Sequence, residues 1–256
     1  MDALEVKVEG NIAYLTFNEP RKSNALSSNL LRELNSFLER AEGDREIDII
    51  VFRGANKKFG AGADLEELLE GTRSKERAHS YSNLMKNFFR KLLTTKKLTI
   101  TLVEGFAVGG QMEMLVFTDI NIANKDSFFS VGGPKIGVFP AEFSVLYLPF
   151  LGRRALRYAI LSERISASEA KELGIIDYVV EDVDKALEEV IGKLKEVDFL
   201  AIKKMKELRG KALELFLPYL DEASQAYASI LQTGNARQRI LAFFQSRTKE
   251  VRSSKP

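Results

Sequence analysis

The stretch from Glu104 to Asp119, EGFAVGGQMEMLVFTD, most limits how this chain can fold, because it joins a strand to a helix through a glycine-rich turn. The preceding segment, Leu98 to Val103, is apolar and β-branched at alternate positions, which predicts a strand inside a sheet. Three glycines leave the turn without side chains, so its backbone can approach another group closely. The apolar residues from Met112 to Phe117 then predict a buried helix.

Glu113 lies inside that apolar helix. Burial without a partner disfavours the charged form of a carboxylate and raises its pKa, which suits a group that transfers protons near neutral pH. The alternative is that Glu113 forms an ion pair with one of the chain's 38 Lys and Arg residues. The sequence leaves both interpretations open.

Composition excludes several classes of function. With 256 residues, 45% of them hydrophobic, the chain can form one large domain or one domain with a helical appendage. Lys and Arg (38) nearly balance Asp and Glu (36), so charge does not favour nucleic acid or an anionic membrane as a partner. No apolar run approaches the roughly 20 residues of a membrane span, and the N-terminus does not resemble a targeting peptide. We therefore expect a cytoplasmic protein.

Thiol chemistry and most metalloenzyme sites are excluded on similar grounds. The chain has no cysteine and a single histidine, His79, so neither a thiolate nucleophile nor a site with two histidines can form. We expect no metal and no tightly bound cofactor.

A second glycine-rich turn follows another predicted strand, Asp48 to Arg53. This turn runs from Phe59 to Leu65, and Asp64 and Glu67 have the spacing of a capping box for the helix that follows. Backbone N–H groups from two such turns could converge on one oxygen and form an oxyanion hole. The alternative is that both turns are tight connections in which glycine serves the backbone alone.

The rest of the chain predicts an α/β core followed by helices. Leu4 to Glu9 and Ile12 to Phe17 form a predicted hairpin, and Ser27 is placed to cap the next helix. From about Lys185 the pattern is helical to the end, with breaks at Pro218 and at Gly234. We therefore divide the chain into a core, residues 1–195, and a helical region, residues 196–256, for oligomerisation.

The helical region carries apolar faces that predict a homo-oligomer, a trimer or a hexamer. The alternative is that these faces close the core of their own subunit. The residues concerned are Leu213, Phe216, Leu217, Leu220, Tyr227, Ile230 and Leu231.

Five segments, in the same order and spacing, resemble the crotonase family, also called the enoyl-CoA hydratase/isomerase family. They are NEPRKSNALS (18–27), FGAGADL (59–65), EGFAVGGQMEM (104–114), ISASEAKELGIID (165–177) and AFFQSR (242–247). The resemblance covers nearly the whole chain. It implies a crotonase-like spiral of ββα units whose C-terminal helices pack subunits into trimers and dimers of trimers.

The resemblance also implies roles for individual residues. The N–H groups of Ala63 and Gly110 would form an oxyanion hole for a thioester carbonyl, the same pairing that the two turns suggest. Coenzyme A, as part of an acyl-CoA substrate, would lie along one set of residues: Lys22, Ser23, Ala25, Ala61, Asp64, Leu65, Phe243 and Arg247. The alternative for Lys22 and Arg247 is that they are solvated surface charges.

Glu113 matches the first of two catalytic glutamates in the hydratases of this family, but the second is missing. Depending on the alignment, Gly133 or Lys135 occupies its position. Glu142 replaces a small residue of the family pattern, and nothing in the sequence positions its side chain.

These features predict an acyl-CoA enzyme that stabilises a thioester enolate. A single glutamate favours double-bond isomerisation, because one base can remove a proton and return it elsewhere, whereas hydration normally needs two carboxyl groups. Two alternatives are a hydratase that uses Glu113 with or without Glu142, and an acyl-CoA-binding or interaction protein with little catalysis. A requirement for Glu113 in any turnover separates the enzymes from the binding protein.

Overall fold

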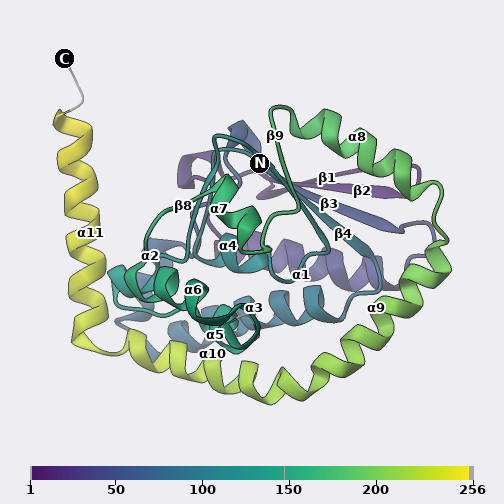
Figure 1. The fold of residues 1–256 in the computed structure, drawn as a ribbon. Helices are drawn as coiled ribbons and strands as arrows, with labels where there is room; N and C mark the ends of the chain where they lie inside the picture. The colour runs from purple at the N-terminus through teal and green to yellow at the C-terminus, as the bar shows by residue number, and fades with distance from the viewer. Residues whose placement is uncertain (1, 147, 254–256) are drawn as a thin grey trace.

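A six-stranded sheet forms the centre of the molecule. The computed structural model describes residues 2–146 and 148–253, with the side chains at 143, 146, 148–154 and 247–253 outside the description. The strand order is β1-β2-β3-β4-β6-β9, and all neighbours are parallel except the β1–β2 hairpin. The strands are β1 (Leu4–Glu9), β2 (Ile12–Phe17), β3 (Ile49–Gly54), β4 (Leu98–Val103), β6 (Ile120–Asn124) and β9 (Tyr178–Val180) (Figure 1).

A second, three-stranded sheet lies beside the first. It contains β5 (Phe106–Val108), β7 (Phe128–Ser130) and β8 (Ile165–Ser166), in the order β5-β7-β8. The chain passes from the large sheet to the small one twice, from β4 to β5 and from β6 to β7. Gly60, after β3, also forms a parallel bridge to Ala107 of β5. Successive turns of the chain therefore place one strand in each layer before a helix, as expected for a spiral of ββα units.

Eleven α-helices lie in the described part of the chain. They are α1 (Ser28–Gly43), α2 (Leu65–Gly71), α3 (Lys75–Thr94), α4 (Gly110–Met114), α5 (Ala141–Leu146), α6 (Leu148–Leu161), α7 (Ala167–Glu172), α8 (Val183–Leu194), α9 (Phe199–Leu213), α10 (Leu217–Leu231) and α11 (Gly234–Ser253). Short 3-10 turns are η1 (Pro20–Lys22), η2 (Ala55–Lys57), η3 (Gly133–Ile136) and η4 (Glu214–Phe216). None of the helices in this part of the chain is both long and apolar enough to cross a membrane.

Helices cover both faces of the large sheet. Alternate side chains of its parallel strands point to opposite sides, and because both sets are apolar, both faces must be buried. In β3, Ile50 and Phe52 join the cluster under α1 and α3, whereas Ile49 and Val51 join the cluster under α8. Local signals fix the ends of these helices. The Ser27 hydroxyl accepts the Leu30 N–H at 3.1 Å, as the predicted cap of α1 requires.

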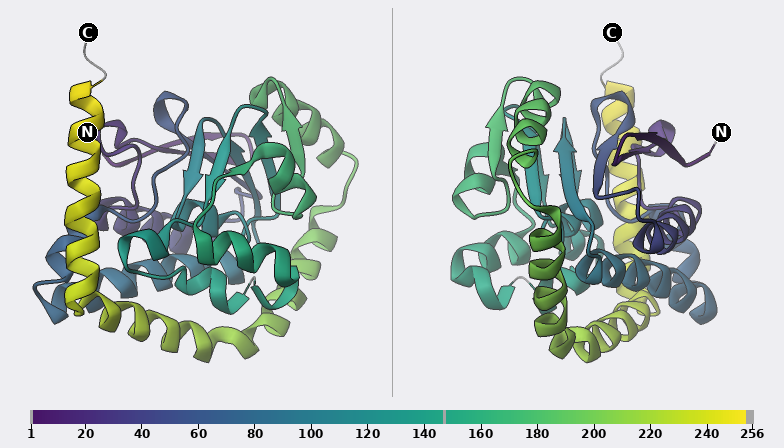
Figure 2. Two further views of the ribbon diagram at one scale, coloured as in Figure 1. Left: turned by 60° about the vertical axis from the view of Figure 1, so that its left-hand side comes forward. Right: turned by 90° about the vertical axis from the view of Figure 1, so that its right-hand side faces the viewer.

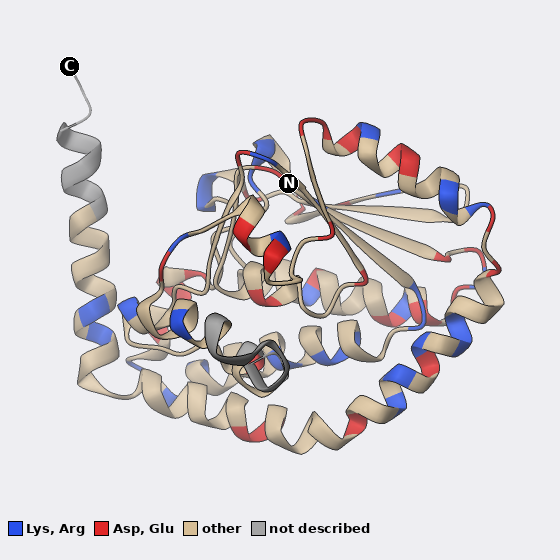
Figure 3. Cartoon of the chain, in the orientation of Figure 1, with Lys and Arg blue, Asp and Glu red and all other residues tan. Residues whose placement is uncertain are grey.

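The last three helices wrap around the outside of this body, and α11 stands along one edge (Figures 1 and 2). The seven apolar residues that suggested an oligomer all pack against the chain's own core. The structure therefore supports the alternative for those residues, that they close their own subunit. Figure 3 shows acidic and basic residues mixed along α8, whereas basic residues predominate along α9.

Two predictions for the stretch from Glu104 to Asp119 differ from the structure. Phe106 to Val108, expected within a turn, is strand β5, because its backbone pairs with β7. The helix expected over Met112 to Phe117 is α4, which begins two residues earlier and ends at Met114.

The capping box predicted at α2 is only half formed. Asp64 accepts the N–H groups of Glu66 and Glu67, but the Glu67 carboxylate accepts from Ser28 instead of returning to Asp64. The Asp64 N–H donates to the Tyr81 hydroxyl at 3.0 Å.

Candidate active site

The two glycine-rich turns meet. A Cβ on Gly62 would lie 2.8 Å from the Val108 carbonyl oxygen and 3.2 Å from the Cα of Gly109. Gly62 and Gly109 also have φ of +87° and +54°, in the region that favours glycine. Glycine at these two positions therefore lets the backbones of the two turns touch, as their sequences suggested.

Ala63 and Gly110 each present an N–H group at this junction. Neither donates to a recorded acceptor within the part of the chain that the structure describes. Gly110 is the first residue of α4, and an N–H in a first helical turn has no partner within its own helix. Both residues line the same cavity.

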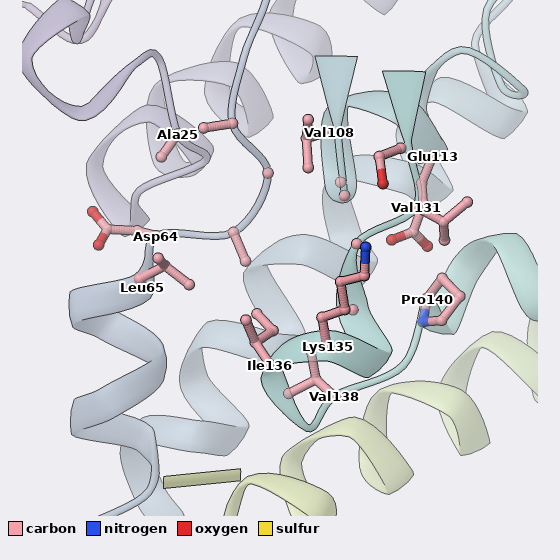
Figure 4. Close-up of a pocket in the computed structure, with 18 of the residues that line it drawn as sticks. Ala25, Asp64, Leu65, Val108, Glu113, Val131, Lys135, Ile136, Val138 and Pro140 are labelled. Atoms are coloured by element: carbon pink, nitrogen blue, oxygen red, sulfur yellow. The ribbon is translucent and has the colours of Figure 1, made fainter. Parts of the chain in front are cut away.

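This cavity, of about 520 Å³, holds the predicted site residues whose side chains are described. Figure 4 shows Ala25, Asp64 and Leu65 on one side and Val108 and Glu113 on the other. The side chain of Arg247 lies outside the described residues. The predicted residues along the cavity are Lys22, Ser23, Ala25, Ala61, Ala63, Asp64, Leu65, Gly110, Glu113 and Phe243.

Glu113 is 5% exposed and faces a second buried carboxyl group, that of Glu142 on α5. The two side chains are hydrogen-bonded, which requires a proton between them. Burial raises the pKa of Glu142 to about 7, while hydrogen bonds to the backbone and to Glu113 oppose the rise. The sequence left Glu113 either catalytic or paired with a Lys or Arg, and the structure places the carboxyl group of Glu142 against it.

Tyr227 of α10 is a third polar group at this end of the cavity. Burial raises the pKa of its phenol, and the charges of Glu113 and Glu142 raise the pKa further. Its ring lies 6.1 Å from that of Phe139, centroid to centroid. The sequence placed Tyr227 only on an apolar helical face. A polar tip within such a face is the signal that would have identified it.

Gly133 and Lys135, the two candidates for the missing glutamate position, both belong to η3 and line the cavity. Lys135 donates from Nζ to the Ser162 carbonyl oxygen at 2.7 Å. A Cβ on Gly133 would lie 3.2 Å from backbone atoms of Val138 and Phe139. The backbone is thus tight where the family glutamate would begin, and the second carboxyl group enters from α5.

Lys22 and Asp64 form an ion pair at the other end of the cavity, with Nζ 2.6 Å from Oδ2. The hydrogen bond to Asp64 is the main cause that raises the pKa of Lys22, so its ammonium group stays protonated at neutral pH. Its ammonium is also 3.6 Å from the carboxylate of Glu66, which is exposed.

A family model described as enoyl-CoA hydratase/isomerase matches residues 7–251. The chain belongs to the enoyl-CoA hydratase/isomerase family. This family member is 28% identical over 245 residues to the short-chain-enoyl-CoA hydratase of Clostridium acetobutylicum, with 93% of each chain covered. It is also 28% identical over 258 residues to the 2,3-dehydroadipyl-CoA hydratase of Escherichia coli, covering 98% of this chain and 99% of that protein.

The fold of this hydratase/isomerase family member matches a solved relative. The crystal structure of enoyl-CoA hydratase from Bacillus halodurans superposes with a TM-score of 0.87 at 23% identity, covering 94% of this chain and 99% of that one. The crotonase-like α/β fold predicted from the sequence is therefore confirmed, and the protein is an enzyme of the hydratase/isomerase family.

Proposed function

We propose that this enzyme adds water reversibly to the double bond of a 2-enoyl-CoA, with Glu113 and Glu142 as an acid–base pair. The observation that carries this proposal is the buried hydrogen bond between the two carboxyl groups. It supplies the second carboxyl group that the sequence position at Gly133 lacks. The reaction needs one group that takes a proton from water and another that gives a proton to the α-carbon.

A pair of carboxyl groups with one shared proton meets that need. Two adjacent carboxylates cannot both ionise easily, so one stays protonated while the other accepts. In the forward reaction the ionised member takes a proton as the water oxygen bonds to the β-carbon. The protonated member gives its proton to the α-carbon. The pair ends with one proton, as it began.

Negative charge develops on the thioester oxygen during this addition. We place that oxygen between the N–H groups of Ala63 and Gly110, which line the cavity and have no recorded acceptor among the described residues. Donors fixed in place before the reaction stabilise such charge without reorganising, and one such donor is typically worth about 10²–10³ in rate.

Coenzyme A would lie toward the Lys22 end of the cavity. Ser23, Ala25, Ala61 and Leu65 offer small or apolar surfaces there, and Lys22 offers a cation near the mouth. Asp64 would act through Lys22, because it caps α2 while it holds the ammonium in place. Phe243 lines the same cavity from α11.

Double-bond isomerisation is the second candidate, favoured by the absence of a carboxylate at Gly133. Its premise was a single carboxyl group in the site, whereas the cavity contains two. A 1,3-proton shift could still use Glu113 alone, with the enolate held by the same two N–H groups.

A panel of acyl-CoA thioesters, analysed by mass spectrometry, tests the proposal. We expect crotonyl-CoA or a longer 2-enoyl-CoA to gain the mass of one water, with heavier product in ¹⁸O-labelled water. A product of unchanged mass from a 3-enoyl-CoA, without any hydration, would favour isomerisation. Binding without turnover across the panel would instead favour an acyl-CoA-binding protein.

We also propose that the enzyme is a homo-oligomer, on a surface other than the one that the sequence suggested. Exposed apolar side chains follow one another along this part of the chain: Leu200 and Leu208 lie in α9, Leu215 in η4 and Tyr219 in α10. Leu215 is 78% exposed and Leu200 is 73% exposed. Exposed apolar side chains of this size can mark a surface for association. Location in the cytoplasm stays a prediction.

A further inference from the structure

The backbone from Phe59 to Asp64 leaves one N–H group unused. Six consecutive residues each offer one donor, and five of these donate to recorded acceptors. Phe59, Gly60 and Ala61 donate to the carbonyl groups of Glu104, Phe106 and Ser23, at 3.0, 3.0 and 3.1 Å. Within the described residues, only the N–H of Ala63 in this run has no recorded acceptor.

Two buried side chains take the donors on either side of Ala63. The Gly62 N–H donates to Oε1 of Gln111 at 2.5 Å, and the Asp64 N–H donates to the Tyr81 hydroxyl at 3.0 Å. Gln111 is fully buried and Tyr81 nearly so. The peptide groups on either side of the one that carries the Ala63 N–H are therefore held by side chains from α4 and α3.

Each of these side chains is itself held at a second point. Gln111 donates from Nε2 to the Asn24 carbonyl oxygen at 2.5 Å, and Tyr81 donates to the Leu26 carbonyl oxygen at 2.7 Å. The Asn24 side chain in turn donates to the carbonyl groups of Ala55 and Lys58, at 3.0 and 2.6 Å. The amide and the hydroxyl can therefore not turn without breaking several buried hydrogen bonds.

Residue 60 is a glycine where the Gln111 amide packs against the backbone. A Cβ at Gly60 would lie 2.2 Å from Nε2 of Gln111, closer than any real contact. The amide thus fills the space that a side chain at residue 60 would occupy. Gln111 also directly follows Gly110, so its side chain ties the second turn to the first within one residue of each N–H group that lines the cavity.

We propose that Gln111 and Tyr81 are positioning residues that aim the Ala63 N–H into the cavity and fix it relative to the Gly110 N–H. This inference rests on the proposed function, in which these two groups bind the thioester oxygen. Without the Gln111 acceptor, the buried Gly62 N–H would lose its partner, and the Ala61–Gly62 peptide plane could rotate to find another, which would shift the next plane, the one that carries the Ala63 N–H. An error of about 1 Å in such a site lowers the rate by about 10².

The test uses Gln111→Leu and Tyr81→Phe, which keep the size of each side chain and remove its hydrogen bonds. We expect kcat to fall by about tenfold to a hundredfold in each variant, with a smaller change in KM, because the loss is felt in the transition state. Gly60→Ala should act in the same direction by displacing the Gln111 amide. Thr101→Val is the matched control, since it removes a buried hydroxyl that donates to Asn121 at 2.6 Å, away from both turns.

The decisive readout is the infrared frequency of a ¹³C-labelled thioester carbonyl bound to each protein. Hydrogen bonds from the two N–H groups should lower that frequency in the wild type and in Thr101→Val, and lower it less in Gln111→Leu and Tyr81→Phe. Unchanged frequency and kcat in both variants would overturn the inference. A wild type without any shift would instead contradict the proposed function. Tyr81→Phe decides the matter if Gln111→Leu does not fold.

Discussion

Glu142 shows how one side chain can change the chemistry available to a site. Alone, Glu113 would be a general base with no acid beside it. With Glu142 hydrogen-bonded to it in a buried cavity, the site would, in the proposed reaction, hold one proton to give and one carboxylate to accept another. The two groups come from separate elements, α4 and α5.

Glu113→Gln should keep the fold and lose most of the proton-transfer activity, because an amide has the shape of the carboxyl group and cannot act as a base. We expect kcat to fall by about 10²-fold or more. Acyl-CoA affinity, measured by calorimetry, should change little. Activity within a few-fold of the wild type would exclude Glu113 as the base.

Glu142→Gln should change how stability depends on pH. The pKa of Glu142 is raised in the folded protein to about 7 from its usual 4.5, so the folded state binds the proton more tightly than the unfolded state. The associated stability is complete below about pH 4.5 and is lost as the pH rises through about 7. The linkage amounts to about 3 kcal/mol as an upper estimate.

Urea unfolding of both proteins at pH 5 and pH 8 measures this effect. The free energy of unfolding of the wild type should drop more between these pH values than that of Glu142→Gln, so the variant gains relative stability at pH 8. A parallel pH dependence in the two proteins would show that Glu142 ionises normally.

The sequence predicted the parts of the site that depend on the backbone. Strand, glycine-rich turn and helix occur in series twice, and Glu113 was singled out from its place in the second series. Ala63 and Gly110 were assigned from the resemblance to the family, and their roles stay a prediction. Glu142 was noticed, but its direction depends on how α5 packs, which no local pattern encodes. Gln111 and Tyr81 were missed because the role proposed for them depends on peptide groups about 50 and 17 residues away in sequence.

At the scale of elements, α9 is attached to the sheet by a buried ion pair. Lys206 is 3% exposed in its side chain and pairs with Asp119, which precedes β6. Asp119 also accepts from the N–H and hydroxyl of Thr99 at 2.8 and 2.7 Å. Burial lowers the pKa of Lys206, and the charge of Asp119 opposes that shift.

Lys206→Ala should therefore destabilise the protein by about 3 kcal/mol, because it leaves a largely buried carboxylate without its closest cation. Arg209→Ala is the matched control. It removes the other cation of Asp119, 3.1 Å away but 40% exposed, and should cost about 1 kcal/mol or less. Urea unfolding compares the two. Equal losses would show that Lys206 contributes no more than a surface charge.

Elements with strong periodicity were predicted well, and those made by long-range pairing were not. The hairpin and β4 have the predicted bounds, because alternation and turn residues are local signals. β5 and β8 have only three and two residues, and they exist because β7 lies between them. Short strands of this kind leave no periodic pattern in the sequence.

At the scale of the whole molecule, the C-terminal helices have two different faces. The inner face closes this subunit's own core and contributes Tyr227 to the cavity. The outer face carries the exposed apolar residues of α9, η4 and α10. The division at residue 195 into a core and an oligomerisation region stays a prediction.

The outer face gives the last prediction. The double variant Leu208→Glu, Leu215→Glu should convert an oligomer into monomers, because two buried carboxylates in an apolar interface would each lack a partner. Val8→Glu is the control, as it places the same charge on an exposed apolar residue of the edge strand β1. Light scattering at micromolar concentration should report a trimer or hexamer for the wild type and the control, and a single chain for the double variant. A monomeric wild type would contradict the homo-oligomer directly. An intact oligomer in the double variant would place the interface elsewhere.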